Sequence, residues 1–600
     1  MHTTEQYSPM PPWQRTHYCG QLTPLDVGSD VALWGWVNAR RDHGGVIFVD
    51  LRDREGLIQL VIRPEVSTGA HRRAGEVRAE YYVAAKGRVV RRSDDTINSA
   101  LKTGEIEVVV NEFEILSPAD SLPFPLVEGD STAEEVRLRH RYLDLRRPQM
   151  QDNLRRRHKA LKSVHKYFDS KGFIEIETPI LFKSTPEGAR DYLVPSRVNH
   201  GKFYALPQSP QLLKQILMIG GFDRYYQIAR CFRDEDLRAN RQPEFSQIDV
   251  EMTCPRPEDI QAVGEEMIAA IYKNVLNTDL RRPFQRISYC KAMERFGVDK
   301  PDLRFGLELT NITSALRGTE FRIFADILQN GGSIYAIYVP EVYELSRREL
   351  DDLIEYSKGQ YKLGLAWVKL PTWEGPIGRH LFSVRRAIEA ALEPAEERVK
   401  FTHGTLLMMG GEPDKIRPAL GGIRLQLAAK FGLDKSDELK FLWVTDFPLF
   451  DYSADDKRMV SVNHPFTAPN PDDLAMLDSA PLKARALAYD MVLNGQELGG
   501  GSIRIHSREL QLKVFELLGL TREEAMDRFG FLLDALKFGA PPHGGIAFGV
   551  DRICMMLCGT DSLRDVIAFP KTQKAVDPMS GAPSEVDPRQ LRELSIKVTP

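Results

Sequence analysis

The chain has 600 residues, of which 42% are hydrophobic and 27% charged, and its formal net charge is −4 at pH 7. A chain of this length is too large for one hydrophobic core, so roughly two to four domains are expected. No stretch approaches about 18 uninterrupted apolar residues, which excludes a membrane-spanning helix, and the small net charge excludes nucleic-acid binding through overall charge alone.

Residues 1–14 lack the basic region followed by an apolar region that marks a secretory signal, and we expect a short frayed tail there. Six cysteines are scattered along the chain without a Cys-x-x-Cys pair: Cys19, Cys231, Cys254, Cys290, Cys554 and Cys558. This pattern argues against a zinc ribbon and against a disulfide framework, and it favours a reducing cytoplasm.

Residues 15–116 form the first predicted domain, which reads as all-β. Turn signals such as Gly44-Gly45 separate five β-rich runs at residues 31–37, 46–51, 57–62, 81–90 and 105–116. Five strands in about 100 residues are typical of a small closed barrel of the oligonucleotide-binding (OB) type. On strand count alone, a β-sandwich or an SH3-like barrel remains an alternative.

Residues 117–150 predict a hinge, because SPADSLPFPLVEGDST is rich in proline and polar residues and precedes the basic RLRHRYLDLRRP. From residue 151 the pattern is mixed α and β. Apolar residues keep helical spacing from Leu154 to Phe168, Gly172 ends this helix, and FIEIETPIL then indicates a strand. Taken alone, this unit is a core element without chemistry.

Residues 225–252, YYQIARCFRDEDLRANRQPEFSQIDVEM, predict two strands around a highly charged loop. The Arg233 guanidinium can donate two hydrogen bonds to a carboxylate or a phosphate. Glu235 lies two residues further on and faces the same way in an extended chain. The pair could hold a multiply charged ligand, although an ion-paired surface hairpin would have the same sequence.

The C-terminal third contains a glycine-rich segment. Residues 308–430 lack such clusters and indicate an inserted domain, whereas PPHGGIAFGVDRICMML at 541–557 places Asp551 and Arg552 at the start of an apolar helix. A helix N-terminus beside an arginine is a favourable anion site. A plain strand-to-helix turn is the alternative.

Together the three clusters resemble motifs 1, 2 and 3 of the class II aminoacyl-tRNA synthetases. TPEGARDYLVPSR, ALPQSPQLLKQ, GVDKPDLRF and LGGGSIRIH further resemble the aspartyl-tRNA synthetases of the bacterial type. The resemblance implies an α+β multidomain fold. It would have an OB-fold anticodon-binding barrel at 15–116, an antiparallel-sheet catalytic core at 151–307 and 431–600, and an inserted α+β domain at 308–430 between motifs 2 and 3.

The reaction that the resemblance implies has two steps. The α-carboxylate of L-aspartate attacks the α-phosphorus of ATP to give aspartyl-adenylate, and the terminal ribose of the tRNA then attacks the activated carbonyl. Neither step needs a protein nucleophile, so catalysis should come from positioning and charge stabilisation. An asparaginyl-tRNA synthetase, an amide-forming ligase on the same core and a non-catalytic relative are the alternatives.

For aspartate, the resemblance implies that Lys214 and Arg504 bind the side-chain carboxylate and that Asp249 holds Lys214. The further aspartate-binding residues would be Glu187, Ser209, Gln211, Arg233, Gln247, Asn463 and His464. The segment containing Glu187 would close over the substrate. The family usually has two adjacent histidines where this chain has Asn463-His464, and an asparagine cannot carry charge.

For ATP, the resemblance gives Arg233 and Arg552 the catalytic roles, at the α- and γ-phosphates, and Glu235 the adenine amino group. The further ATP-binding residues would be Asp234, Gln242, Glu497, Gly549, Val550 and Asp551. Asp490 and Glu497 are the candidate ligands of Mg²⁺, which prefers carboxylate oxygens combined with phosphate oxygens.

The resemblance also implies binding of tRNA-Asp and formation of a homodimer. Phe48 would stack on an anticodon base, although it could instead be a core residue, and Arg41, Gln59 and Glu107 would make further contacts. His43 followed by glycines is typical of relaxed enzymes that also charge tRNA-Asn, and the region of Asp95 would contribute to this choice. We therefore predict a non-discriminating enzyme.

Overall fold

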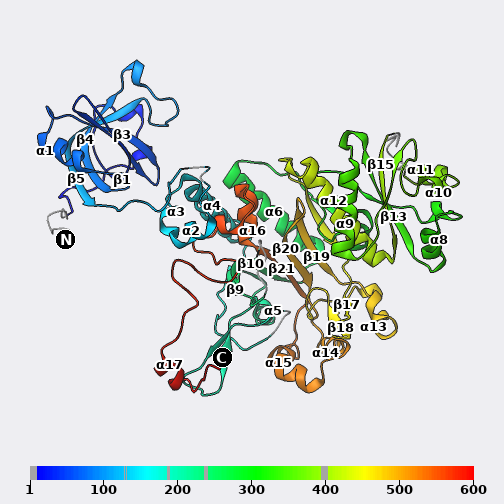
Figure 1. The fold of residues 1–600 in the computed structure, drawn as a ribbon. Helices are drawn as coiled ribbons and strands as arrows, with labels where there is room; N and C mark the ends of the chain where they lie inside the picture. Colours follow the sequence, from blue (N-terminus) through cyan, green and yellow to red (C-terminus); the bar gives the residue numbers. More distant parts are fainter. Residues whose placement is uncertain are drawn as a thin grey trace. The chain divides into compact units, whose positions relative to one another are not determined.

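The computed structural model describes residues 10–127, 129, 131–185, 189–235, 241–392 and 403–599. It divides into two compact units, Met1–Asp152 and Asn153–Pro600 (Figure 1). No described helix is long and apolar enough to cross a membrane.

The first unit contains a closed barrel with the strand order β1-β2-β3-β5-β4. Its strands are β1 (Asp30–His43), β2 (Val46–Asp53), β3 (Gly56–Ile62), β4 (Tyr82–Arg91) and β5 (Ile106–Ser117). Alternate residues such as Ile47, Val49 and Leu51 fill the barrel core, so their neighbours in sequence face outward. The predicted OB-type barrel is confirmed.

Two features of this unit differ from the prediction. The barrel domain is not all-β, because helix α1 (Thr68–Glu76) lies between β3 and β4 and packs against β5 and β2. Strand β1 also continues through the polar residues up to His43, because they pair with β2 as far as the turn at Gly44-Gly45. After the barrel come α2 (Glu134–Arg139), α3 (Arg141–Asp144) and the first residues of α4 (Pro148–Ser170).

The second unit is built on a sheet of eight described strands in the order β11-β16-β19-β20-β21-β10-β9-β6. Neighbouring strands are antiparallel except for the pairs at the two edges, β11 with β16 and β6 with β9. The strands are β6 (Ile174–Glu175), β9 (Arg224–Phe232), β10 (Glu244–Thr253), β11 (Gln285–Ser288), β16 (Phe441–Thr445), β19 (Ala488–Leu493), β20 (Gln496–Ile503) and β21 (His543–Gly549). The predicted antiparallel catalytic core is confirmed.

Helices α4, α6 (Pro257–Leu276) and α16 (Val550–Cys558) pack on one face of this sheet. Ile248 and Val250 of β10 join that core. The alternate residues Gln247, Asp249 and Glu251 therefore face the opposite side of the sheet. Outside the insertion, the second unit also contains the helices α5 (Gln211–Ile219), α7 (Tyr289–Phe296), α13 (Met476–Ser479), α14 (Arg508–Leu517), α15 (Arg522–Ala535) and α17 (Pro588–Glu593). Two small hairpins pair β7 (Leu193–Pro195) with β8 (Phe203–Ala205) and β17 (Phe450–Ser453) with β18 (Arg458–Ser461).

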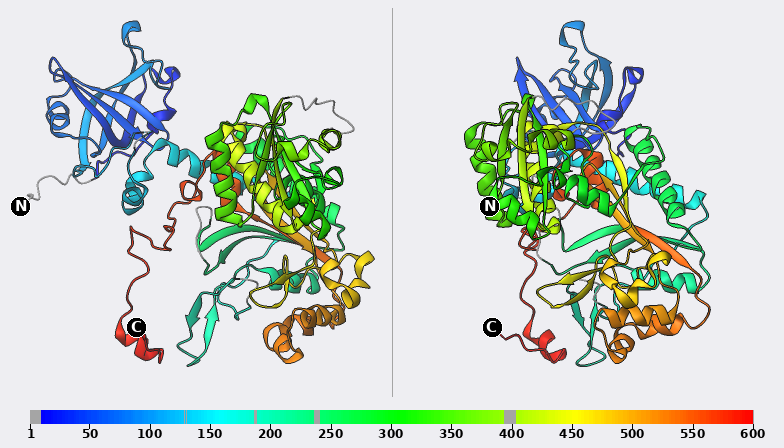
Figure 2. Two further views of the ribbon diagram at one scale, coloured as in Figure 1. Left: turned by 45° about the vertical axis from the view of Figure 1, so that its right-hand side comes forward. Right: turned by 90° about the vertical axis from the view of Figure 1, so that its right-hand side faces the viewer.

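The predicted insertion is an antiparallel sheet between two layers of helices (Figure 2). Its strands are β12 (Leu309–Asn311), β13 (Ser333–Pro340), β14 (Ala366–Leu370) and β15 (Gly404–Gly411). Helices α9 (Arg347–Tyr361) and α12 (Pro413–Phe431) cover one face, and α8 (Arg322–Gln329), α10 (Gly378–Leu381) and α11 (Arg385–Leu392) cover the other. Because both faces are buried, β13 and β15 are apolar without alternation.

Candidate active site

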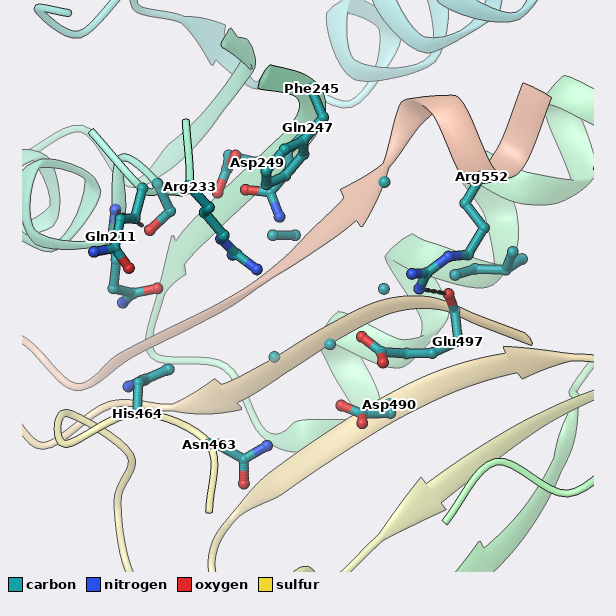
Figure 3. Close-up of a pocket in the computed structure, with 18 of the residues that line it drawn as sticks. Gln211, Arg233, Phe245, Gln247, Asp249, Asn463, His464, Asp490, Glu497 and Arg552 are labelled. Carbon is teal, nitrogen blue, oxygen red and sulfur yellow. Dashed lines mark hydrogen bonds between the residues drawn. The ribbon is translucent and has the colours of Figure 1, made fainter. Parts of the chain in front are cut away.

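A pocket of 560 Å³ opens on the face of the eight-stranded sheet that α4, α6 and α16 leave uncovered (Figure 3). Strands β10, β20 and β21, the N-terminus of α16 and the start of α5 all contribute to its walls. These segments are far apart in sequence, and they include the motif 2 and motif 3 regions singled out above. The structure therefore brings together most of the residues that the sequence nominated.

One end of the pocket holds a buried cluster of two cations and two carboxylates. The Lys214 ammonium lies 3.1 Å from Asp249 Oδ1 and 3.5 Å from Glu251 Oε2. Arg504 donates to both Glu251 oxygens, at 2.9 and 3.1 Å. All four side chains are at most 1% exposed, so each charge is compensated inside the protein rather than by water.

Glu251 is the carboxylate that both cations share. Burial alone would raise the pKa of Glu251, but Arg504 and Lys214 outweigh burial and bring it below its usual value. Gly545 lies opposite Glu251 in the strand register and leaves space for this carboxylate, which any side chain at that position would fill. Lys214 and Arg504 therefore point hydrogen-bond donors into the pocket with their orientation fixed from behind.

His464 lies beside this cluster and accepts a hydrogen bond at Nε2 from Arg504, with an N–N distance of 2.6 Å. Burial lowers the pKa of His464 well below its usual value, and the charges of Arg504 and Lys214 lower it further. The imidazole is therefore neutral. It contributes an uncharged contact to Arg504 and does not add a positive charge to the cluster of Lys214 and Arg504.

Three buried polar atoms of the pocket-lining residues have no hydrogen-bond partner among the described residues. They are Gln211 Nε2, Asp249 Oδ2 and Asn463 Oδ1. Buried polar groups without a partner are rare and costly in native proteins. A wall with one free donor and two free acceptors suits a small polar ligand that carries both kinds of group.

Arg233 follows β9 and lies over the ring of Phe245, with its guanidinium carbon 5.0 Å from the ring centroid. This stacking holds the guanidinium plane while the nitrogens face the pocket (Figure 3). Glu235 instead forms an ion pair of 2.9 Å with Arg241. A ligand that uses the Glu235 carboxylate would share it with Arg241.

The opposite end of the pocket is formed by the start of α16. Arg552 donates to the backbone carbonyl of Glu497, which directs its guanidinium into the pocket (Figure 3). Asp551 is buried, and its carboxylate accepts from Arg157 at 2.5 Å and from the backbone N–H of Ser246 at 3.3 Å. Asp551 thus ties α16 to α4 and β10, so that Arg552 is held on a rigid helix end.

Two carboxylates face one spot above Gly500. A methyl group on Gly500 would lie 2.5 Å from Asp490 Oδ1 and 3.8 Å from Glu497 Oε1. Burial raises the pKa of Asp490 well above its usual value, and the charges of Glu497 and Asp299 raise it further. A divalent cation would relieve this repulsion, so the pair fits Mg²⁺. Within the described chain, no group of three His, Cys, Asp or Glu side chains is placed to hold a metal, so a bound ion would also need ligands from a substrate.

The other nominated residues occupy the following places. Gln242 binds the backbone of Lys571 with both amide atoms, at 2.8 and 3.0 Å, and Gln247 accepts from Cys231. Ser209 Oγ accepts from the backbone N–H of Gln211, the first residue of α5. Asp234 donates its backbone N–H to the carbonyl oxygen of Arg190, Gly549 is the N-cap of α16, and Val550 is its first residue. Glu187 lies outside the described residues.

The outer face of the barrel carries a second group of nominated residues. Arg41 donates to Asp50 at 2.9 Å and to Gln59 at 3.2 Å, and Gln59 donates to Glu107 at 2.9 Å. This row crosses β1, β2, β3 and β5. Phe48 lies on the same face of β2 as Asp50, half-exposed and outside the barrel core.

Two nominated residues of the barrel domain, His43 at the end of β1 and Asp95, are exposed. His43 meets the edge of Phe48, with ring centroids 6.4 Å apart. Asp95 lies in the connection between β4 and β5. His43 is therefore next to the proposed stacking residue.

Sequence reasoning missed several residues of the site. Asp299, Arg241 and Phe245 line the pocket, and Glu251 lies behind it and pairs with Lys214 and Arg504. The signal for Glu251 was available, because it follows Gln247 and Asp249 at the period of two that puts all three on one face of β10. The positions of Asp299 and Arg241 depend on how loops fold back over the sheet, which no periodicity encodes.

Comparison with known families gives two matches. Residues 133–573 match the family model described as tRNA synthetases class II (D, K and N), and residues 31–116 match the model of the OB-fold nucleic acid binding domain of the tRNA anticodon type.

Two relatives of similar length share about half of their residues with this chain. The chain is 51% identical to the aspartate–tRNA(Asp/Asn) ligase of Caldanaerobacter subterraneus over 586 residues, which cover 98% of both chains. It is 52% identical to the protein of the same name from Syntrophotalea carbinolica over 589 residues, again 98% of both chains. Among solved structures, asparaginyl-tRNA synthetase from Pyrococcus horikoshii complexed with asparaginyl-adenylate aligns with a TM-score of 0.59 at 20% identity, covering 93% of this chain and 98% of that one, which is a likeness of fold.

Proposed function

The chain belongs to the class II tRNA synthetases of the D, K and N group, and we propose on that premise that it joins L-aspartate to tRNA-Asp and tRNA-Asn with ATP. The relatives that share half of its sequence over nearly their whole length carry the name aspartate–tRNA(Asp/Asn) ligase. The family resemblance predicted from the motifs is thus confirmed.

The observation that carries the choice of aspartate is the cationic end of the pocket. Lys214 and Arg504 have hydrogens to donate and no lone pairs to accept with. The side-chain carboxylate of aspartate has only acceptors and therefore suits both. Asparagine would direct its amide hydrogens at one of these donors, and this mismatch supports aspartate over asparagine as the substrate.

The first step follows from placing aspartate at this end and ATP at the other. Arg233 lies between the two ends, where it can donate to the α-carboxylate and to the α-phosphate at the same time and hold them in line. Charge builds up on the α-phosphate oxygens during the attack, and a fixed guanidinium stabilises it. Arg552 takes the terminal phosphates, which leave as diphosphate.

The second step uses the same positioned groups. The terminal ribose hydroxyl of the tRNA attacks the carbonyl carbon of the adenylate, and AMP leaves. Gln211, Asp249 and Asn463, whose free polar atoms line the wall, keep the aminoacyl group in place during both steps. A Mg²⁺ ion held by Asp490 and Glu497 would neutralise phosphate charge when bound.

The barrel supplies recognition of the anticodon. Phe48 offers a partly exposed ring on which a base can stack. Gln59, on the same outer face of the barrel, carries both a donor and an acceptor for a base edge. An imidazole such as that of His43 can donate or accept, so it can meet both cytosine and uracil. The anticodons of tRNA-Asp and tRNA-Asn differ at one position, which is cytosine in the first and uracil in the second. The presence of His43 therefore supports relaxed specificity.

The chain also forms a homodimer in this proposal. Large apolar side chains at the β6 edge of the sheet are exposed, including Ile174 at 50%, Ile180 at 46% and Leu181 at 51%. Exposed apolar residues of the β7–β8 hairpin, among them Leu193 and Phe203, extend this surface. Several exposed large apolar side chains in one region are typical of a subunit interface.

Two assays test the function. ATP–diphosphate exchange should depend on aspartate and not on asparagine, and aspartate should be attached to purified tRNA-Asp and tRNA-Asn at comparable rates. Exchange with asparagine would contradict the substrate. Absence of tRNA-Asn charging above background would contradict relaxed specificity and leave a strictly discriminating aspartyl enzyme.

A further inference from the structure

The β1–β2 turn that carries His43 needs two glycines. His43 pairs with Val46, and the two residues between them, Gly44 and Gly45, have φ angles of +61° and +86°. A two-residue hairpin turn of type I′ requires positive φ at both central positions, which glycine adopts without strain. No heavy atom lies near the point where either glycine would carry a Cβ, so conformation rather than space explains both.

A turn of two glycines is free to move unless something outside the hairpin fixes it. Here helix α1 does so. His71 Nε2 donates to the carbonyl oxygen of Gly45 at 2.7 Å, across 26 residues of sequence. The hairpin's own ladder does not require this bond, because the carbonyl belongs to the turn.

The contact belongs to a closed ring of interactions. Asp42 Oδ1 accepts from the Gly45 N–H at 3.3 Å, and Asp42 pairs with Arg40 at 3.9 Å. Arg40 donates to the carbonyl oxygen of Ala74 at 3.1 Å, one helical turn from His71 on α1. The hairpin and the helix are thus joined at two points, through His71 and through Arg40.

Helix α1 itself is fixed to the barrel. Ser67 caps its N-terminus by accepting from the Ala70 N–H, and Ala70 and Ala74 are buried in the barrel core. On another side Arg73 forms an ion pair with Glu114 of β5. His71 therefore connects the turn to a rigid part of the domain, and His43 is held beside Phe48 as a consequence.

We propose that His71 is a positioning residue for tRNA choice, which fixes the Gly44-Gly45 turn and so sets where His43 meets the anticodon. The inference rests on the proposed charging of both tRNAs. His71 touches neither substrate; it acts through the Gly45 carbonyl. If the turn is released, His43 no longer stays at the base that differs between the two tRNAs, and the contact that tolerates uracil suffers most.

The test compares His71→Ala and His71→Gln with the wild-type chain. The Gln side-chain amide can place a donor where Nε2 lies, so H71Q should keep the bond and H71A should lose it. His17→Ala is the matched control, because His17 lies in the same unit, before β1, and its ring contacts Thr16. The quantities to measure are kcat and KM for each purified tRNA, and ATP–diphosphate exchange without tRNA.

H71A should raise KM for both tRNAs, and kcat/KM for tRNA-Asn should fall about threefold or more beyond that for tRNA-Asp, the size expected for one lost hydrogen bond. Exchange should be unchanged, and H71Q and H17A should behave as wild type. Equal losses for the two tRNAs, or an H71Q as impaired as H71A, would overturn the positioning role. If the wild type charges tRNA-Asp alone, relaxed specificity is wrong, and the KM for tRNA-Asp then tests the positioning role. A KM that rises in H71A but not in H71Q or H17A supports the role. A KM that is unchanged in H71A overturns it.

Discussion

At the scale of single residues, Glu251 determines whether the two pocket cations can act together. It binds Arg504 through both carboxylate oxygens and lies 3.5 Å from Lys214. In Glu251→Gln the side chain keeps its shape, but its amide hydrogens face Arg504 and the shared negative charge is gone. The KM for aspartate in ATP–diphosphate exchange should rise about tenfold or more, because charge-assisted hydrogen bonds contribute about 1.5–3 kcal/mol each.

The KM for ATP should change little in this variant, since Glu251 lies at the end of the pocket that we propose for aspartate. Glu308→Gln is the matched control, because Glu308 forms an exposed ion pair with Arg295. An aspartate KM within twofold of wild type would show that Arg504 and Lys214 keep their positions without Glu251.

His464 gives a prediction about pH at the same scale. Burial, Arg504 and Lys214 lower its pKa well below the usual value, so it stays neutral in the folded state. The unfolded chain takes up a proton at this residue below about pH 6.5. Because the unfolded state then binds more protons, the free energy of unfolding falls as the pH drops through that value.

The melting temperature should therefore decrease between about pH 7.5 and pH 5.5, and the decrease should be smaller in His464→Gln, which has no proton to take up. His543, whose pKa burial also lowers, remains in the variant and keeps part of the decrease. His17→Gln should follow the wild type. Parallel curves for wild type and H464Q would rule out a neutral buried His464.

At the scale of elements, the glycine run of β20 determines whether the acidic pair can bind a cation. A methyl group on Gly500 would lie 2.5 Å from Asp490 Oδ1, so the carboxylate must move. In Gly500→Ala the Mg²⁺ concentration needed for half-maximal ATP–diphosphate exchange should rise about tenfold, as for other changes beside a metal ligand. Gly530→Ala is the control, because its methyl group would meet only Met526 at 3.5 Å. If G500A needs the same Mg²⁺ concentration as the wild type, Asp490 and Glu497 are not the ligands of the metal.

Helices and strands could be predicted where the spacing of apolar residues in the sequence matches the residues that are buried. Elements without such a spacing could not. The alternation in β2 and β10 is visible in the sequence, and so are the caps and glycines around α16. Helix α1 was missed because TGAHRRAGE contains only two buried residues, both alanine, and two glycines. The outer part of β1 is polar because its side chains face solvent, so its pairing with β2 had no apolar signal.

The candidate site shows the same division. Lys214, Asp249, Arg504, Arg233 and Arg552 were nominated by resemblance, and they line one pocket. The ion pair of Glu235 with Arg241 and the hydrogen bond from His71 to the backbone of Gly45 each join separate segments through side chains. Such contacts depend on the finished fold, and one sequence without its structure does not contain them.

At the scale of the whole molecule, the exposed apolar surface at β6 and the β7–β8 hairpin predicts a homodimer. Replacing Ile180 and Leu181, which are 46% and 51% exposed, by aspartate would bury charges at such an interface. Sedimentation should show a dimer for wild type and a monomer for the double variant. Val342→Asp, at a residue 79% exposed on the insertion, should leave the dimer intact. A monomeric wild type at micromolar concentration would contradict the proposal.

The two compact units have separate hydrophobic cores, so chemistry and tRNA binding should be separable by mutation. Arg233→Ala removes the donor that we propose for the α-phosphate, which should slow ATP–diphosphate exchange about 30- to 1,000-fold, the effect of about 2–4 kcal/mol. The variant should still bind tRNA with an affinity within twofold of wild type, because the barrel face is untouched. Arg256→Ala, at a surface ion pair with Asp259, is its control.

Phe48→Ala should have the reverse effect. Loss of one aromatic stacking surface, about 1–3 kcal/mol, should raise the KM for tRNA roughly 5- to 150-fold, while exchange without tRNA stays at the wild-type rate. Leu25→Ala, at a residue 94% exposed elsewhere on the barrel, should change neither quantity. A Phe48 variant impaired in exchange, or an Arg233 variant that no longer binds tRNA, would mean that the two units do not work as separate binding surfaces.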